Sequence, residues 1–167
     1  MKNEERPQHQ ATARSRTVAT TVLMVATFMD LMDSTITNVA LPTIGKDLHA
    51  TPEQLEWTLA GYVIAFATLL ITGGRLGDIF GHRRIFVIGM VGFTLASLGA
   101  ALSQTGDLLV ATRVIQGAFA GIMVPQVLSS VQVMFAPEER APVLGIIGAL
   151  SSLGAIGGLI LGGWLVT

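Results

Sequence analysis

The sequence of 167 residues has no cysteine, a single tyrosine and few charged side chains. The lack of cysteine excludes disulfides, thiolate metal sites and cysteine nucleophiles, although it says nothing about the redox compartment. Charged residues make up 13% of the chain, roughly half of what a soluble domain carries. The formal net charge of −1 offers no basic surface for nucleic acid. These shortages exclude an ordinary soluble domain and make nucleic acid an unexpected partner.

Apolar residues and glycine are abundant instead. Hydrophobic residues make up 51%, mean hydropathy is +0.64 and there are 19 glycines. Most of the chain therefore needs an apolar solvent, and small residues let membrane helices approach one another closely. The composition predicts an all-α membrane protein in the lipid bilayer.

Five apolar runs follow a polar segment at 1–16, which we expect to be a disordered cytoplasmic tail. Each run has about the 17–25 residues that cross a bilayer as a helix, and Pro125 is expected to kink the long fourth run. Their number excludes a signal peptide, and their lack of a charged face excludes surface helices. Thr51, followed by Pro52 and Gln54, predicts a helix N-cap. The transmembrane domain at 17–167 is predicted to have spans at about 17–41, 55–72, 85–103, 108–135 and 142–166.

Lysine and arginine gather on one side of these spans. The first loop has only Lys46, the third loop has neither residue, and Arg113 alone lies inside a span. By the positive-inside rule the N-terminus lies in the cytoplasm, and we expect a multi-pass protein of the cell (plasma) membrane. The basic residues on the cytoplasmic side are Lys2, Arg6, Arg14, Arg16, Arg75, Arg83, Arg84 and Arg140.

Two carboxylates lie inside the first span. Asp30, Asp33 and Thr37 share one helical face and form a polar stripe. A carboxylate at such depth costs about 2.5–3.5 kcal/mol, so it should face a bundle interior or a water-filled cavity. A desolvated carboxylate beside a second one can change its protonation near neutral pH, as proton coupling requires. The alternative is a structural carboxylate that is permanently paired.

Arg113 is the expected partner of this stripe. With the predicted orientation, the depths of Asp33 and Arg113 differ by roughly 5–6 Å at 1.5 Å per residue, which a long side chain covers. Gln116 lies on the same face of the fourth span as Arg113. The alternative is an arginine that snorkels to the outer interface.

Two glycine-containing segments add to these signals. In the second loop, Gly81 can supply a tight turn, and Asp78 can pair with Arg83 or Arg84 or face a helix N-terminus. An ordinary basic loop is the alternative. In the fifth span the glycines recur every four residues, which by itself predicts close helix packing. The glycines of this motif are Gly154, Gly158, Gly162 and Gly163.

Together the four segments resemble motifs of the major facilitator superfamily, and most closely those of its fourteen-span drug:proton antiporters. The resemblance covers essentially everything after residue 17, with the motifs in the right order. It implies that the five helices form most of the N-terminal half of a major facilitator bundle. The matching segments are 32–42 on the first span, 74–84 in the second loop, 109–117 on the fourth span and 154–163 on the fifth.

The resemblance also implies a function. It is that of a secondary active transporter that exports drugs or other small amphipathic molecules by alternating access, driven by the proton gradient without a cofactor. Such an exporter can confer antibiotic resistance. The loop motif of Gly74, Asp78, Gly81, Arg83 and Arg84 would latch the cytoplasmic side, and the fifth-helix glycines would limit leak. The candidates for proton coupling or the substrate pathway are Asp30, Asp33, Thr37, Asn38, Arg113 and Gln116.

Three positions differ from the family's pattern, and one candidate lies outside it. Ile79 and His82 stand where basic residues are common, and Leu159 stands where a proline is expected, which leaves the direction of antiport open. Asp30 is not part of the motif, so its role rests on its position in the membrane alone.

The chain has fewer spans than a complete superfamily member, which pairs two six-span halves around its substrate. We therefore expect a fragment whose partners are a small-molecule substrate and the missing C-terminal helices. The alternatives are a non-transporting truncated protein or assembly subunit, and a transporter of a different metabolite. An enzyme is not expected, because no nucleophile–base set, metal-binding spacing or phosphate loop is present.

Overall fold

The computed structural model describes residues 13–166, which form five helices and no strand. All five are long and apolar enough to cross a membrane, which confirms the predicted all-α fold. Each helix begins before its predicted span, and α4 continues through Pro125. The helices are α1 (Ala13–Asp47), α2 (Pro52–Phe80), α3 (His82–Ala101), α4 (Gly106–Met134) and α5 (Pro137–Val166).

The predicted disordered segment at 1–16 is only partly covered by this description. Residues 1–12 lie outside the described residues, and residues 13–16 belong to α1. The helix therefore starts ahead of the apolar run, and the expected disorder is wrong for these four residues. Hydropathy marks where a chain meets lipid, whereas a helix can continue into water because its backbone bonds are internal.

Two turns follow the local signals in the sequence. The Thr51 hydroxyl accepts a hydrogen bond from the Gln54 amide at 3.2 Å, and the Gln54 side chain accepts one from the Thr51 amide at 2.9 Å. This capping box confirms the predicted start of α2. Gly81 joins α2 to α3 with φ of +92°, a conformation that glycine adopts without strain, so the predicted tight turn is also present.

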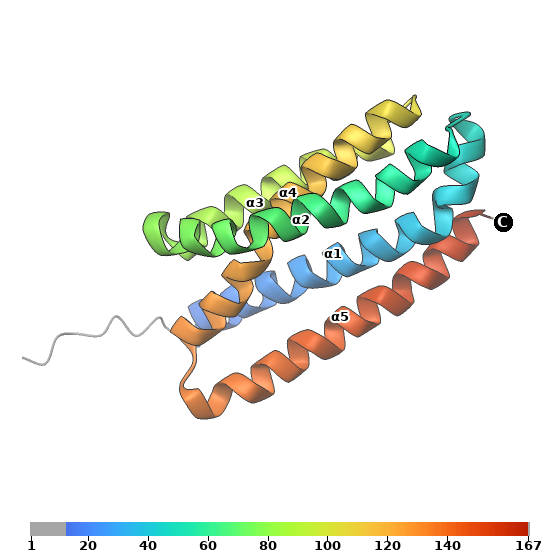
Figure 1. Ribbon diagram of the computed structural model, residues 1–167. Coiled ribbons are helices and arrows are strands. Elements are labelled where there is room, and N and C mark those ends of the chain that lie inside the picture. The colour runs from blue at the N-terminus through green and yellow to red at the C-terminus, as the bar shows by residue number, and fades with distance from the viewer. Residues whose placement is uncertain (1–12, 167) are drawn as a thin grey trace, which may run out of the picture.

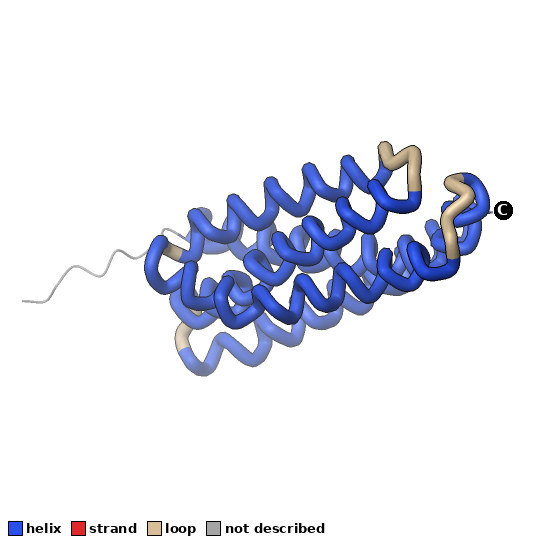
Figure 2. The backbone as a smooth tube through the Cα atoms, turned by 45° about the horizontal axis from the view of Figure 1, so that its top comes forward, coloured by secondary structure: helices blue, strands red, loops and turns tan. Residues whose placement is uncertain are grey.

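The helices form two groups. α2, α3 and α4 pack together, while α1 packs mainly along α5, as Figure 1 shows. The α2–α3 and α4–α5 connections lie at the end where α1 begins, and the other two connections lie at the opposite end near the end of α5 (Figures 1 and 2). Successive helices are thus antiparallel, as repeated membrane crossing requires.

Glycines set the spacing within each group. A Cβ atom at Gly117 of α4 would meet the backbone oxygen of Tyr62 in α2. On α5, a Cβ at Gly154 would lie 2.6 Å from the Phe28 oxygen, and one at Gly158 would lie 2.7 Å from the Met32 oxygen. The predicted close packing is therefore confirmed for Gly154 and Gly158, whose partner is the backbone of α1. Gly162 approaches the side chain of Val39, whereas a Cβ at Gly163 would meet nothing within 4 Å.

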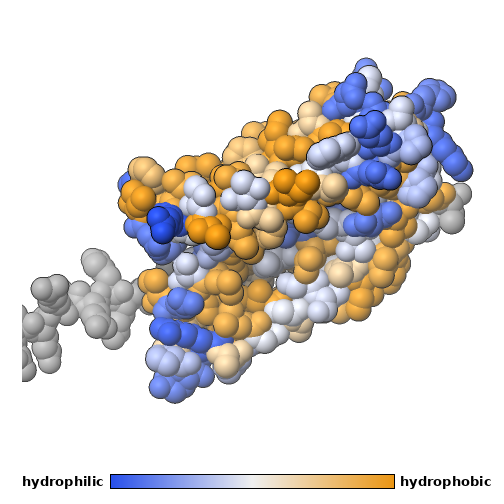
Figure 3. All heavy atoms as spheres, in the orientation of Figure 1, coloured by the Kyte–Doolittle hydropathy of each residue, from blue (hydrophilic) through white to orange (hydrophobic). Residues whose placement is uncertain are grey.

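The outer surface is apolar around the middle and polar at both ends. Figure 3 shows hydrophobic residues along the flanks, with hydrophilic residues gathered at the two ends of the helices. Large apolar side chains such as Ile71 and Leu95 are 77% and 64% exposed. An exposed apolar surface of this extent belongs in lipid, where helices satisfy their backbone groups internally.

Candidate functional site

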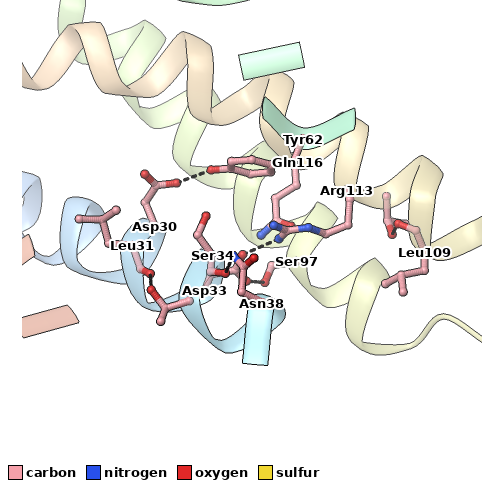
Figure 4. A network of polar contacts seen from close by, with 12 residues as sticks. Asp30, Leu31, Asp33, Ser34, Asn38, Tyr62, Ser97, Leu109, Arg113 and Gln116 are labelled. Atoms are coloured by element: carbon pink, nitrogen blue, oxygen red, sulfur yellow. Dashed lines mark hydrogen bonds and ion pairs between the residues drawn. The ribbon is translucent and has the colours of Figure 1, made fainter. Parts of the chain in front are cut away.

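An ion pair connects the two helix groups. Arg113 of α4 donates from Nη1 to Oδ2 of Asp33 in α1 at 2.6 Å, as drawn in Figure 4. Ser97 of α3 donates from its hydroxyl to the other carboxylate oxygen at 3.0 Å. The predicted pairing is confirmed, and Asp33 contacts side chains from two helices of the neighbouring group.

Arg113 lies inside the protein. Its residue is 2% exposed, which contradicts the alternative of an arginine that snorkels to the membrane surface. The same Nη1 donates to Oε1 of Gln116 at 2.6 Å, and the guanidinium carbon lies 4.5 Å from the centre of the Tyr62 ring. A carboxylate, an amide and an aromatic face therefore compensate the buried positive charge.

Asp30 lies one helical turn before Asp33 and has a different partner. The Tyr62 hydroxyl of α2 donates to Oδ1 of Asp30 at 2.7 Å (Figure 4). Within residues 13–166, Asp30 has no cation at ion-pair distance. The two carboxylates are therefore chemically distinct, since one is neutralised by a guanidinium and the other accepts a hydrogen bond from a hydroxyl.

Two donors next to the ion pair have no acceptor in the described part of the chain. They are Nε of Arg113 and Nε2 of Gln116, both fully buried. Buried polar groups without a partner are rare in native proteins and call for an explanation. Here they leave Arg113 held through one nitrogen only, so the guanidinium keeps capacity for another acceptor.

Thr37 and Asn38 lie further along α1 and do not join this network. The Asn38 side chain is exposed and donates to the Ser34 backbone oxygen at 2.8 Å. Thr37 is half-buried and makes no hydrogen bond to Asp33 or Arg113 within the described residues. The structure thus brings together four of the six candidates for proton coupling or the substrate pathway, namely Asp30, Asp33, Arg113 and Gln116.

Tyr62 and Ser97 are members of the network that the sequence did not single out. Tyr62 is the only tyrosine in the chain, and it lies in the middle of an apolar span. A lone phenol at that depth needs a hydrogen-bond partner, which is a usable signal. Ser97 gives no such signal, because a serine in a membrane helix can bond its own backbone.

At the α2–α3 turn, Asp78 faces His82. Oδ1 of Asp78 lies 3.5 Å from Nε2 of His82, and in residues 13–166 it forms no ion pair with Arg83 or Arg84. Of the two arrangements considered for Asp78, the pairing with Arg83 or Arg84 is wrong, and Asp78 lies instead beside the first residue of α3. α2 ends at Phe80 and α3 begins at His82, so the turn brings positions 78 and 82 together while both arginines stay exposed.

Gln126 of α4 supports this turn from inside. It is fully buried, and its Nε2 donates to the Gly73 backbone oxygen at 2.7 Å. Its Oε1 lies 2.9 Å from Nδ1 of His82. The loop is thereby tied to α4 through a residue that the sequence analysis missed, since a lone glutamine gives no indication of its partners.

Comparison with known proteins gives the family. Residues 23–167 match the family model described as Major Facilitator Superfamily. The probable actinorhodin transporter of Streptomyces coelicolor is 43% identical over 151 residues. The puromycin resistance protein pur8 of Streptomyces alboniger is 41% identical, and the tetracenomycin C resistance and export protein of Streptomyces glaucescens is 40% identical.

These relatives are much longer than the matched region. The matches cover 90%, 86% and 89% of this chain, but only 26%, 29% and 27% of the respective relatives. The chain therefore spans less than a third of the length of the curated relatives it matches.

Proposed function

Because this chain belongs to the major facilitator superfamily, we propose that it forms part of a secondary active transporter that exports drugs or other small amphipathic molecules in exchange for protons. The observation that carries the proposal is the buried contact of Asp33 with Arg113 between the two helix groups. The relatives named for resistance to puromycin and for resistance to and export of tetracenomycin C support the substrate class.

The arrangement suits alternating access. α1 and α5 pack closely, as do α2 and α4. The two groups meet through an apolar cluster that includes Leu23 and Val127, and through polar side chains around Asp33. A change of protonation among the polar side chains at this contact, which include Asp30, alters an electrostatic contact between groups that can otherwise move as units. The proton gradient supplies the energy, and no cofactor takes part.

We also propose an orientation and a location. The exposed Arg83 and Arg84 lie at the α2–α3 turn, at the end where α1 begins, and this end faces the cytoplasm under the positive-inside rule. The Asp78–His82–Gln126 contacts then lie on the cytoplasmic side of the plasma membrane, where they would latch α2, α3 and α4.

The substrate pathway is proposed for the whole protein rather than for these five helices alone. Superfamily members place substrate between two helical halves. The polar network here presents one wall, made by α1, α2, α3 and α4. Further helices would supply the opposite wall and decide which drug fits.

Radiolabelled puromycin provides the test, in inside-out membrane vesicles that contain the protein made from its complete reading frame. We expect respiration to drive puromycin into vesicles with the protein more than into vesicles without it, and a protonophore to abolish the difference. Asp33→Asn should lose this uptake. Asp47→Asn is the matched control, because it makes the same change on an exposed residue at the end of α1. Equal uptake with and without the protein would refute the proposal.

A further inference from the structure

We propose that the two carboxylates of α1 have separate roles, in which Asp30 exchanges the proton and Asp33 remains ionised to hold α1 against α4. This division rests on the proposed function and assigns its coupling step to a residue outside the family's motif. The two residues are three positions apart on one helix, yet their partners come from different helices and differ in charge.

Asp33 is the carboxylate that forms an ion pair. Its two oxygens accept from Arg113 at 2.6 Å and from Ser97 at 3.0 Å. Protonation would remove its charge and leave the guanidinium of a residue that is only 2% exposed without its counter-charge. An unpaired buried charge is strongly destabilising, so the pair is expected to persist as a pair.

Asp30 can gain or lose a proton without breaking an ion pair. Its partner is the Tyr62 hydroxyl at 2.7 Å, which can donate to an ionised carboxylate and equally to the carbonyl oxygen of a neutral acid. Asp30 and Asp33 are both half-buried, so the two carboxylates differ in their partners and not in their exposure. The proton binds one carboxylate oxygen from one side of the membrane and leaves the same oxygen toward the other.

Tyr62 connects the two sites. Its hydroxyl contacts Asp30 while the centre of its ring lies 4.5 Å from the guanidinium carbon of Arg113. Gly117 packs against the Tyr62 backbone oxygen, which fixes this part of α2 against α4. A change in the protonation of Asp30 can therefore affect Arg113 through a single aromatic ring, which is buried.

The charged and titratable groups around Asp30 support the same assignment. α1 contributes Asp33, α2 contributes Tyr62 and α4 contributes Arg113, while α3 contributes only the uncharged Ser97. Acidic and basic residues on α5 are confined to its first turn, far along the helix from this level. Because Arg113 forms its ion pair with Asp33, an ionised Asp30 has no cation of its own within the described residues.

The test separates proton coupling from conformational exchange in vesicles that contain the protein made from its complete reading frame. Gradient-driven puromycin uptake requires both. Counterflow requires only exchange, and it is measured with a protonophore present, with unlabelled puromycin inside and labelled puromycin outside. We expect Asp30→Asn to lose gradient-driven uptake while keeping counterflow that no longer depends on pH. We expect Asp33→Asn to lose both.

The amount of each variant in the membrane is measured by immunoblot. The double variant Asp33→Asn with Arg113→Gln removes both charges and should recover part of the counterflow that Asp33→Asn alone loses. The division is overturned if Asp30→Asn keeps normal gradient-driven uptake, if it loses counterflow as well, or if Asp33→Asn loses only the gradient-driven uptake. Absence of uptake by the unmodified protein would instead refute the proposed export function.

Discussion

Adjacent glycines on α5 provide a sharp test of how closely this helix must approach α1. A Cβ at Gly158 would lie 2.7 Å from the Met32 oxygen and 2.8 Å from Cβ of Thr35, whereas a Cβ at Gly157 meets nothing within 4 Å. Gly158→Ala therefore forces the two helices apart, because the Met32 oxygen is backbone and cannot rotate away. Gly157→Ala makes the same chemical change one residue earlier without a clash.

The expected magnitudes follow from two opposing effects. Replacing glycine by alanine inside a helix stabilises by about 0.5–1 kcal/mol, since alanine loses less backbone entropy on folding. Overpacking costs about 1–3 kcal/mol. Gly157→Ala should thus be neutral or stabilising, and the free energy of unfolding of Gly158→Ala should be lower than that of Gly157→Ala by about 1–3 kcal/mol.

Thermal unfolding of the detergent-solubilised protein made from its complete reading frame checks this difference. We therefore expect Gly158→Ala to melt clearly below Gly157→Ala. Equal melting temperatures would show that α5 does not approach the α1 backbone this closely, and the reasoning from the fifth-helix glycines would fail.

Three further predictions concern single residues. Tyr62→Phe should lower the free energy of unfolding by about 1 kcal/mol, because one hydrogen bond to Asp30 is lost. In thermal unfolding, Tyr62→Leu should show a larger loss of stability, because it also removes the ring beside Arg113. Equal losses for the two variants would exclude a stabilising role for the ring. Gln126→Ala should cost about 1–3 kcal/mol in the same assay, because it leaves buried groups of the α2–α3 turn without partners. In intact cells, a membrane-impermeant maleimide should label Glu53→Cys, at the start of α2, but not Glu138→Cys, at the start of α5. The unmodified protein gives the background labelling. The reverse pattern would show that the proposed orientation is inverted.

The number and order of the helices could be predicted from the sequence because the signals are local. Charge is segregated into short connections, and the capping box at Thr51 needs only residues that follow one another. The helix ends were less predictable. α2 continues to Phe80 through Arg75 and Asp78, since helical hydrogen bonding does not stop where the chain leaves the apolar layer.

The candidate site could be predicted only in part, for a related reason. The pairing of Asp33 with Arg113 follows from depth, which sequence position gives directly once the spans are placed. The partners of Asp30 and His82 depend instead on how neighbouring helices are rotated, and depth carries no information about rotation. Close contacts such as that of Gly117 with Tyr62 set this rotation, and they are formed only when the helices pack.

Glycine and charge therefore act at different contacts in this fold. Glycines bring α5 onto the backbone of α1 and α4 onto the backbone of α2, and such contacts have no titratable group through which a ligand or proton could change them. Between α1 and α4 an apolar cluster that includes Leu23 and Val127 is joined by the Asp33–Arg113 ion pair, with Asp30 beside it on Tyr62. A proton changes electrostatic contacts far more than it changes packing contacts. Movement driven by protons should thus occur between the two helix groups rather than within either of them.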